Sequence, residues 1–171
     1  MTATIRRARA DEAEALAALG AATFTATFGH LYSRSNLEKF LAKNHSPAAY
    51  RDVLADARSA VWIAENAGER TGYAVAGPCT LPVPDMPPDC GELARLYLVK
   101  EAQGTGLGRR LLDVALEFLR DRYRCIYLSV YRDNVIAQRL YARAGFNKVF
   151  EYKYMVGDHA DPEFIMELSR P

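Results

Sequence analysis

The sequence predicts one mixed α/β (α+β) domain that spans residues 1–171. A chain of this length fits a single domain and is long enough to bury a core. Apolar, strand-like runs such as Leu93–Val99 alternate with amphipathic segments such as Leu107–Leu119, a pattern typical of domains that combine a sheet with helices. Half of the residues are hydrophobic and 25% are charged, which is ordinary for a globular protein.

Local signals give the expected elements in order. Asp11 with Glu14 three residues later resembles a helix-capping box, Pro47 suits a first helical turn, and Gly145 suits a helix end. The prolines of Leu81–Asp89 favour a loop. The expected strands are Ala3–Arg7, Ala60–Glu65, Arg70–Ala76, Glu92–Val99, Arg124–Tyr131, Phe146–Met155 and Phe164–Leu168. The expected helices are Asp11–Gly20, Leu31–Lys43, Ala48–Ala57, Leu107–Arg122 and Asp133–Ala144.

Charge and composition argue against several classes of function. The formal net charge is +1, so bulk electrostatics favour neither nucleic acid nor a membrane as partner. No apolar run approaches the ~18 residues of a membrane span, and the N-terminus lacks a signal-type apolar core; we therefore expect a cytoplasmic protein. Cys79, Cys90 and Cys125 lack metal-ligand spacing and the three histidines are scattered, so no metal site is expected. Cys125 is expected to be a buried packing residue.

The run Gln103–Arg110 predicts an anion site between a strand and a helix. Unpaired backbone N–H groups and the positive end of a helix dipole attract phosphate there, and glycines allow close approach. The Walker pattern fails because Arg109 follows Gly108, and the dinucleotide pattern fails because Arg109 occupies its third glycine position. A ligand that carries a pyrophosphate remains the natural expectation.

Two motifs together resemble the Gcn5-related N-acetyltransferase (GNAT) superfamily. Gln103, Gly106 and Gly108 match its Gln/Arg-x-x-Gly-x-Gly/Ala loop, and the run from Asn134 to Phe146 matches its Asn-x-x-Ala-x-x-x-Tyr-x-x-x-Gly-Phe signature. The resemblance covers about Ala60–Gly145 well. It implies a mixed, mostly antiparallel, twisted sheet that splays at its centre, with helices on both faces.

The resemblance also implies acetyl-CoA as co-substrate, without a metal. Backbone N–H groups from Gln103 to Arg109 are expected at the pyrophosphate, and backbone groups of Leu98 and Val99 along the pantetheine arm, opposite Asn134. For the ribose phosphate, Arg109, Arg110 and Arg143 are candidates, and each is equally compatible with a solvated surface arginine. The expected cofactor residues are Leu98, Val99, Gln103, Gly104, Thr105, Gly106, Leu107, Gly108, Arg109, Asn134, Ala137 and Arg143.

The chemistry implied by the family is direct attack of an amine on the thioester in a ternary complex. An ammonium with a pKa near 10 is only about one part in a thousand neutral at pH 7, so a base is needed. Glu92 occupies the family's base position and is expected to act directly or through water; a strand-end salt bridge is the alternative. Tyr141 is expected to protonate the leaving thiolate, with simple packing on the sheet as its alternative. A backbone N–H near Val99 is expected to polarise the carbonyl.

The acceptor is less constrained. The segments Leu81–Glu92 and Glu151–Glu163 are acidic, with Asp85, Asp89, Glu92, Glu151, Asp158, Asp161 and Glu163 against the single Lys153. If they border the acceptor cleft, they suit a polycation; solvated acidic loops are the alternative. Segments Phe24–Leu41 and Val156–Glu167 resemble bacterial PaiA-like spermidine/spermine acetyltransferases. The candidate acceptor residues are His30, Tyr32, Asp85 and Asp158.

The function predicted from the sequence is thus N-acetylation of a small-molecule amine. A protein N-terminal or lysine acetyltransferase and a catalytically silent acyl-CoA sensor are the alternatives, and the retention of both Glu92 and Tyr141 favours an enzyme. Acyl chains other than acetyl remain open. Apolar alternation in Phe146–Met155 and Phe164–Leu168 is compatible with a monomer and with a homodimer.

Overall fold

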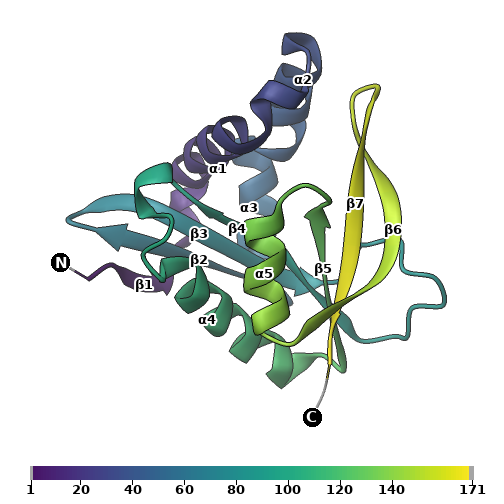
Figure 1. Cartoon of the computed structure of the whole chain (residues 1–171). Helices are drawn as coiled ribbons and strands as arrows, with labels where there is room; N and C mark the ends of the chain where they lie inside the picture. The colour runs from purple at the N-terminus through teal and green to yellow at the C-terminus, as the bar shows by residue number, and fades with distance from the viewer. Residues whose placement is uncertain (1, 170–171) are drawn as a thin grey trace.

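A computed structural model describes residues 2–169. It contains a seven-stranded sheet in the order β1-β2-β3-β4-β5-β7-β6 (Figure 1). The strands are β1 (Thr4–Arg7), β2 (Ala60–Asn66), β3 (Glu69–Pro78), β4 (Cys90–Leu98), β5 (Cys125–Tyr131), β6 (Phe146–Val156) and β7 (His159–Leu168). The α-helices are α1 (Ala13–Phe28), α2 (Arg34–Asn44), α3 (Pro47–Ala55), α4 (Leu107–Arg122) and α5 (Val135–Arg143).

The sheet is mostly antiparallel, and β4 and β5 form its parallel pair. Their pairing runs from Cys90–Cys125 to Leu93–Leu128 and stops there, although β4 continues to Leu98 and β5 to Tyr131. The two strands therefore separate along their carboxyl-terminal halves, and the predicted fold, with a mixed sheet splayed at its centre, is confirmed.

Helices cover both faces of the sheet. On one face α4 packs against β2, β3 and β4, and its buried side chains include Leu111, Leu112, Ala115, Leu116 and Leu119, as the amphipathic pattern predicted. On the other face α1 and α3 pack together over Ile63 of β2 and Tyr73 of β3. The seam between β4 and β5 lies between these layers, beside α5 (Figure 1).

The start of the chain differs from the sequence prediction. The capping box is formed by Arg9 and Glu12 rather than by Asp11 and Glu14: a Glu12 side-chain oxygen accepts the N–H of Arg9 at 2.8 Å. The helix that follows continues to Phe28, beyond the predicted end at Gly20. Gly20 belongs inside it because a Cβ there would lie 2.2 Å from the Tyr50 hydroxyl.

A β-bulge in β4 decides which side chains share a face. Ala76 of β3 pairs with Leu93 and Val75 pairs with Arg95, which leaves Ala94 as an extra residue. Side chains alternate along a strand, and one extra residue reverses the alternation beyond it. Glu92, Arg95 and Tyr97 consequently line one cavity, although their numbering alone places them on opposite faces.

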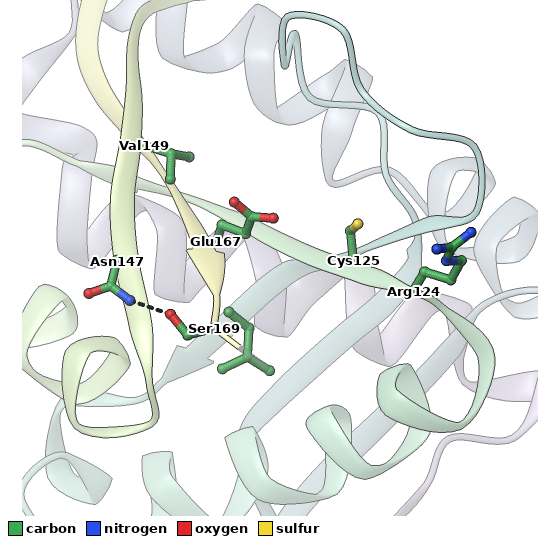
Figure 2. A pocket seen from close by; sticks show the side chains of 7 residues that line it. Arg124, Cys125, Asn147, Val149, Glu167 and Ser169 are labelled. Atoms are coloured by element: carbon green, nitrogen blue, oxygen red, sulfur yellow. Dashed lines mark hydrogen bonds between the residues drawn. The ribbon is translucent and has the colours of Figure 1, made fainter. Parts of the chain in front are cut away.

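Cys125 departs from the expectation of full burial. It is partly exposed and lines a surface cavity of about 330 Å³, together with Arg124 and Glu167 (Figure 2). Cys90 beside it is buried, and the three cysteines are free thiols. Among the described residues, no helix combines the length and the apolar character that crossing a membrane requires.

Candidate active site

A cavity of about 780 Å³ occupies the opening between β4 and β5 and continues toward α1 and α2. Two groups of side chains line it. The glycine-loop wall comprises Leu98, Gln103, Gly104, Gly106, Gly108, Arg109, Asn134, Ala137, Tyr141 and Arg143. The carboxylate wall comprises Tyr32, Glu92, Arg95, Tyr97, Ser129, Tyr152, Tyr154, Asp161 and Glu163. Nine of the twelve predicted cofactor residues thus lie on the glycine-loop wall, together with the predicted catalytic residue Tyr141.

The glycine loop has the backbone that an anion site requires. Gly104 and Gly106 have φ of 74° and 86°, a left-handed conformation that other L-residues adopt at a cost. Gly106 is the N-cap of α4, so the N–H groups of the first helical turn point out of the helix toward the loop. An added Cβ at Gly104 or Gly106 would meet nothing within 4 Å. The glycines therefore serve backbone conformation and leave space above the loop.

Three predicted cofactor residues do not line the cavity. Leu107 is buried in the core, and the Thr105 hydroxyl donates to Ala102 O at 2.7 Å. The N–H of Val99 donates to Thr71 O at 2.9 Å, and its carbonyl accepts from Ala102 N at 3.0 Å. The prediction that Val99 offers backbone groups to the cofactor or polarises the carbonyl is therefore wrong.

Leu98 takes that position instead. Alternate residues of an antiparallel strand bond to the same partner strand, so bonding of Val99 to β3 directs the backbone groups of Leu98 to the open side. Gln103 Nε2 lies 3.4 Å from Leu98 O, whereas its backbone N–H is already bonded to Lys100 O at 3.2 Å. The side chain of Gln103 thus holds the loop against β4.

The three candidate arginines have different surroundings. Arg110 turns away and donates to Ala3 O at 2.8 Å. Arg109 lines the cavity while its Nε donates to Asp113 at 2.8 Å, and Arg143 also lines it. Arg109 and Arg143 remain the cations placed to meet a phosphate.

Helix α5 presents the second motif to the cavity. The Asn134 side-chain oxygen caps the helix by accepting Ala137 N at 3.3 Å, which leaves its amide N–H groups as donors. Tyr141 is two turns further on the same face; it is 8% exposed and packs on Phe146 with ring centroids 6.1 Å apart. Burial raises the pKa of Tyr141 above its ordinary value, and the charge of Glu163 adds to the rise, so this phenol holds its proton.

Glu92 lies on the opposite wall and is 7% exposed. The backbone N–H and the hydroxyl of Thr80 donate to its Oε2 at 3.0 Å and 3.2 Å. Burial raises the pKa of Glu92, and these two hydrogen bonds oppose the rise. No ion pair of Glu92 occurs within residues 2–169, so the salt-bridge alternative has no support.

Two further carboxylates, Asp161 and Glu163 on β7, were placed only in an acidic segment by sequence reasoning. Both line the cavity. Asp161 is 2% exposed and accepts the Tyr32 hydroxyl, and Ser129 of β5 donates to Glu163 Oε2 at 2.9 Å. Their spacing of two on a strand places both on one face, a signal that becomes usable once the β6–β7 hairpin is known.

The predicted acceptor residues divide accordingly. Tyr32 lines the cavity, but His30, Asp85 and Asp158 are exposed and do not line it. Asp158 is bonded instead to the Asn36 side chain of α2. His30, Asp85 and Asp158 are directed to solvent, so this cavity gives no support to their predicted contact with the acceptor.

Aromatic side chains pack beside the carboxylate wall. Phe28 of α1 lies edge-on to Tyr97 and Tyr131, with centroids 6.4 and 5.9 Å apart. Burial and the charge of Arg95 lower the pKa of His45 to about 3, so His45 is neutral there. In the described part of the chain no three His, Cys, Asp or Glu side chains are arranged to hold a metal ion.

Comparisons with known proteins agree with this geometry. The model of the acetyltransferase (GNAT) family matches residues 24–146. An uncharacterised N-acetyltransferase of Lactobacillus delbrueckii subsp. lactis is 28% identical over 88% of this chain and 87% of its own. The spermine/spermidine N(1)-acetyltransferase of Bacillus subtilis is 41% identical over 56 residues, 32% of this chain and 37% of its own.

The fold agrees with solved structures as well. The PaiA N-acetyltransferase of Thermoplasma acidophilum, in complex with coenzyme A, superposes with a TM-score of 0.77 over 99% of this chain and 100% of that one, at 20% identity. The resemblance stated from the two motifs is thereby confirmed. With a family match over most of its length and a cavity that joins both motifs, this chain is an N-acetyltransferase of the GNAT family.

Proposed function

We propose that this enzyme transfers an acetyl group from acetyl-CoA to a small, positively charged primary amine, by direct attack while both substrates are bound. The observation that carries the proposal is the single cavity with a phosphate-binding loop on one wall and three carboxylates on the other. Acetyl-CoA would lie against Leu98, the glycine loop and Asn134, with Arg109 or Arg143 at the ribose phosphate. Its thioester would then reach the part of the cavity between Tyr141 and the carboxylate wall.

The proposed chemistry assigns a proton step to each wall. Glu92 accepts a proton from the amine, directly or through water, because burial gives it the raised pKa that a base working near neutral pH needs. Tyr141 gives a proton to the departing thiolate, and its raised pKa keeps that proton in place until it is needed. The N–C bond forms as the C–S bond breaks.

A polyamine is the acceptor that the carboxylate wall suits best. Glu92, Asp161 and Glu163 provide negative charge, and Tyr32, Tyr152 and Tyr154 provide hydroxyl and ring surfaces that contact alkylammonium groups. The partial similarity to a spermine/spermidine acetyltransferase supports the same class.

Enclosure of the cavity favours a small amine over a protein substrate. Tyr32, which precedes α2, bonds to Asp161, and Asn36 of α2 bonds to Asp158, so this part of the chain is joined to the β6–β7 hairpin. A peptide-wide groove would need that side open. A silent acyl-CoA sensor would have no need for Glu92 and Tyr141 on facing walls.

The test is thiol release from acetyl-CoA with a panel of spermidine, spermine, short diamines, aminoglycosides, amino acids and peptide N-termini. Turnover with spermidine or spermine above that with peptides supports the proposal. Turnover with peptides alone contradicts the acceptor class. Tight acetyl-CoA binding without release by any amine contradicts the catalytic proposal and favours the sensor.

A further inference from the structure

We propose that Glu163 on β7 is a second catalytic carboxylate, which binds the reacting ammonium group of the acceptor and accepts its proton, and that Ser129 and Tyr152 position it. The inference rests on the proposed function and deepens it. It gives Glu163 the direct contact with the amine, and it leaves Glu92 to act through water or on a more distant part of the acceptor.

A directed chain of hydrogen bonds holds Glu163. Ser129 has one hydroxyl proton and donates it to Glu163 Oε2 at 2.9 Å. Tyr152, whose hydroxyl lies 2.8 Å from Ser129 Oγ, must then be the donor in that second bond. The chain joins β5, β6 and β7 and fixes one carboxylate oxygen. The other, Oε1, has no hydrogen-bond partner among the described residues and is left for a ligand in the cavity.

Glu163 also lacks a cation. Within residues 2–169 no Lys, Arg or His side chain forms an ion pair with it, and its charged neighbour on β7 is Asp161, of the same sign. The negative charge of Glu163 raises the pKa of tyrosines on four segments of the chain: Tyr32, Tyr97, Tyr141, Tyr152 and Tyr154.

Arg95, the cation of the same wall, is engaged elsewhere. Its guanidinium donates to Asn44 O at 2.8 Å and lies 5.0 Å from the centre of the Tyr50 ring. Glu163 is half-buried, and a half-buried carboxylate without a cation is stabilised by an opposite charge placed beside it. The ammonium group of an acceptor supplies the missing charge.

Glu163 is the carboxylate on the side of the reacting centre. Its charge acts on Tyr141 as well as on Tyr152 and Tyr154, whereas the charge of Glu92 acts on Tyr152 and Tyr154. Asp161 is less available than Glu163: Oδ2 accepts the Tyr32 hydroxyl, and His159 Nε2 lies 3.0 Å from Oδ1 without the orientation of a hydrogen bond. An amine beside Glu163 therefore also lies near the proton donor proposed for the thiolate.

The proton count closes with these two groups and Glu92. Burial raises the pKa of Glu163 to about 7, the Ser129 hydrogen bond opposes that rise and the charge of Asp161 adds to it. The ammonium gives one proton to ionised Glu163 and becomes the nucleophile. Its nitrogen bonds to the acetyl carbon, the C–S bond breaks, and Tyr141 protonates the thiolate. The second proton leaves nitrogen through water, by way of Glu92, and restores the Tyr141 phenol, and Glu163 then loses its proton to solvent.

A direct titration tests the carboxylate without relying on turnover. In the full chain labelled with carboxyl-¹³C glutamate, Glu163→Gln identifies the Glu163 signal, and its midpoint is expected near pH 7. Ser129→Ala should move the midpoint to higher pH, because the lost hydrogen bond favoured the ionised form. Spermidine, added with coenzyme A bound, should move it to lower pH. A titration midpoint that stays the same in Ser129→Ala and on addition of spermidine would overturn the proposal.

The rate profile supplies the second readout. For wild type, kcat/KM with spermidine should decrease as pH falls below about 7. Glu163→Gln should lower kcat/KM about 100-fold and abolish this acidic decrease, whereas Glu92→Gln should retain it. Glu167→Gln is the matched control, because Glu167 lies on the same strand but lines the separate surface cavity (Figure 2); it should behave as wild type.

The two proposals fail in different ways. A Glu163→Gln enzyme that keeps the wild-type acidic decrease and rate overturns the role of Glu163 while amine acetylation stands. A wild type that releases no thiol with any amine overturns the proposed function. In that case the response of the Glu163 signal to spermidine still decides whether Glu163 binds an ammonium group.

Discussion

Thr80 donates two hydrogen bonds to one oxygen of Glu92, from its backbone N–H at 3.0 Å and from its hydroxyl at 3.2 Å. Thr80 follows β3 at the start of the proline-containing loop, and Glu92 lies on β4. The pairing fixes the carboxylate within the cavity and leaves Oε1 as the oxygen that can meet a ligand or water. The proline-containing loop thus orients the Glu92 carboxylate and adds no acidic side chain of its own to the site.

Replacement of Glu92 by Gln should lower kcat about 100-fold, because the amide keeps the shape but cannot take up, even through water, a proton that leaves the amine during the reaction. Acetyl-CoA affinity, measured by calorimetry, should be unchanged. Thr80→Val is the graded control: it removes the hydroxyl but keeps the backbone N–H, so a smaller loss is expected. A Glu92→Gln enzyme at full rate from about pH 6 to pH 9 would exclude the base role.

Tyr141→Phe should lower kcat by about 10- to 100-fold with little change in acetyl-CoA affinity. The ring packs on Phe146 and is 8% exposed, so removal of the hydroxyl alone should leave the melting temperature nearly unchanged. Because burial and Glu163 raise the pKa of Tyr141, the phenol stays protonated through the alkaline range. The wild-type rate should therefore show no alkaline decline below about pH 10. Unchanged turnover of Tyr141→Phe would remove the hydroxyl from the mechanism.

Gly106→Ala should weaken acetyl-CoA binding at least tenfold. Its φ of 86° costs a residue with a Cβ about 1–2 kcal/mol, so the loop should relax and misdirect its N–H groups. Gly68→Ala is a matched control: φ is 82°, an added Cβ also meets nothing within 4 Å, and the residue lies in the β2–β3 turn. The two variants should lose similar amounts of stability, and only Gly106→Ala should lose affinity for acetyl-CoA. Equal acetyl-CoA affinities in the two variants would contradict the role of the loop.

Glu12→Gln should destabilise the fold by about 3 kcal/mol in urea unfolding, because it removes a buried charge from an ion-pair network. Glu12 is 3% exposed and accepts from Arg6 at 2.7 and 2.8 Å. Hydrogen bonding to Arg6 holds the pKa of Glu12 well below its ordinary 4.5. Its contribution is therefore present above about pH 4.5 and is lost as pH falls further.

An exposed ion pair provides the comparison for that network. Glu14 and Arg51 are 68% and 56% exposed, so Glu14→Gln should change stability by less than about 1 kcal/mol. If both variants lost the same stability, burial of Glu12 would not be the cause.

The sequence predicted the glycine-loop wall well because its signals are local. A strand, a glycine turn and a helix follow one another in Gln103–Arg110, and helical spacing alone placed Asn134 and Tyr141 on one face. Val99 was misplaced because the direction of its N–H depends on pairing with Thr71, a residue far away in the sequence.

The carboxylate wall was largely beyond sequence reasoning for the same reason. The acidic segments were recognised, but which members face inward depends on the β6–β7 register and on its pairing with β5. That pairing brings Glu163 to Ser129 and sends Asp158 to Asn36. The bulge at Ala94, which aligns Glu92 with Arg95, carries no residue signature in this chain.

The most direct test of the account is an initial-rate study in which acetyl-CoA and spermidine are varied together. Because the two walls line one cavity, both substrates should be bound before reaction, and double-reciprocal plots should intersect. Coenzyme A should be released only when the amine is present. Parallel lines, or coenzyme A release with formation of an acetylated enzyme in the absence of amine, would contradict direct transfer between the two walls.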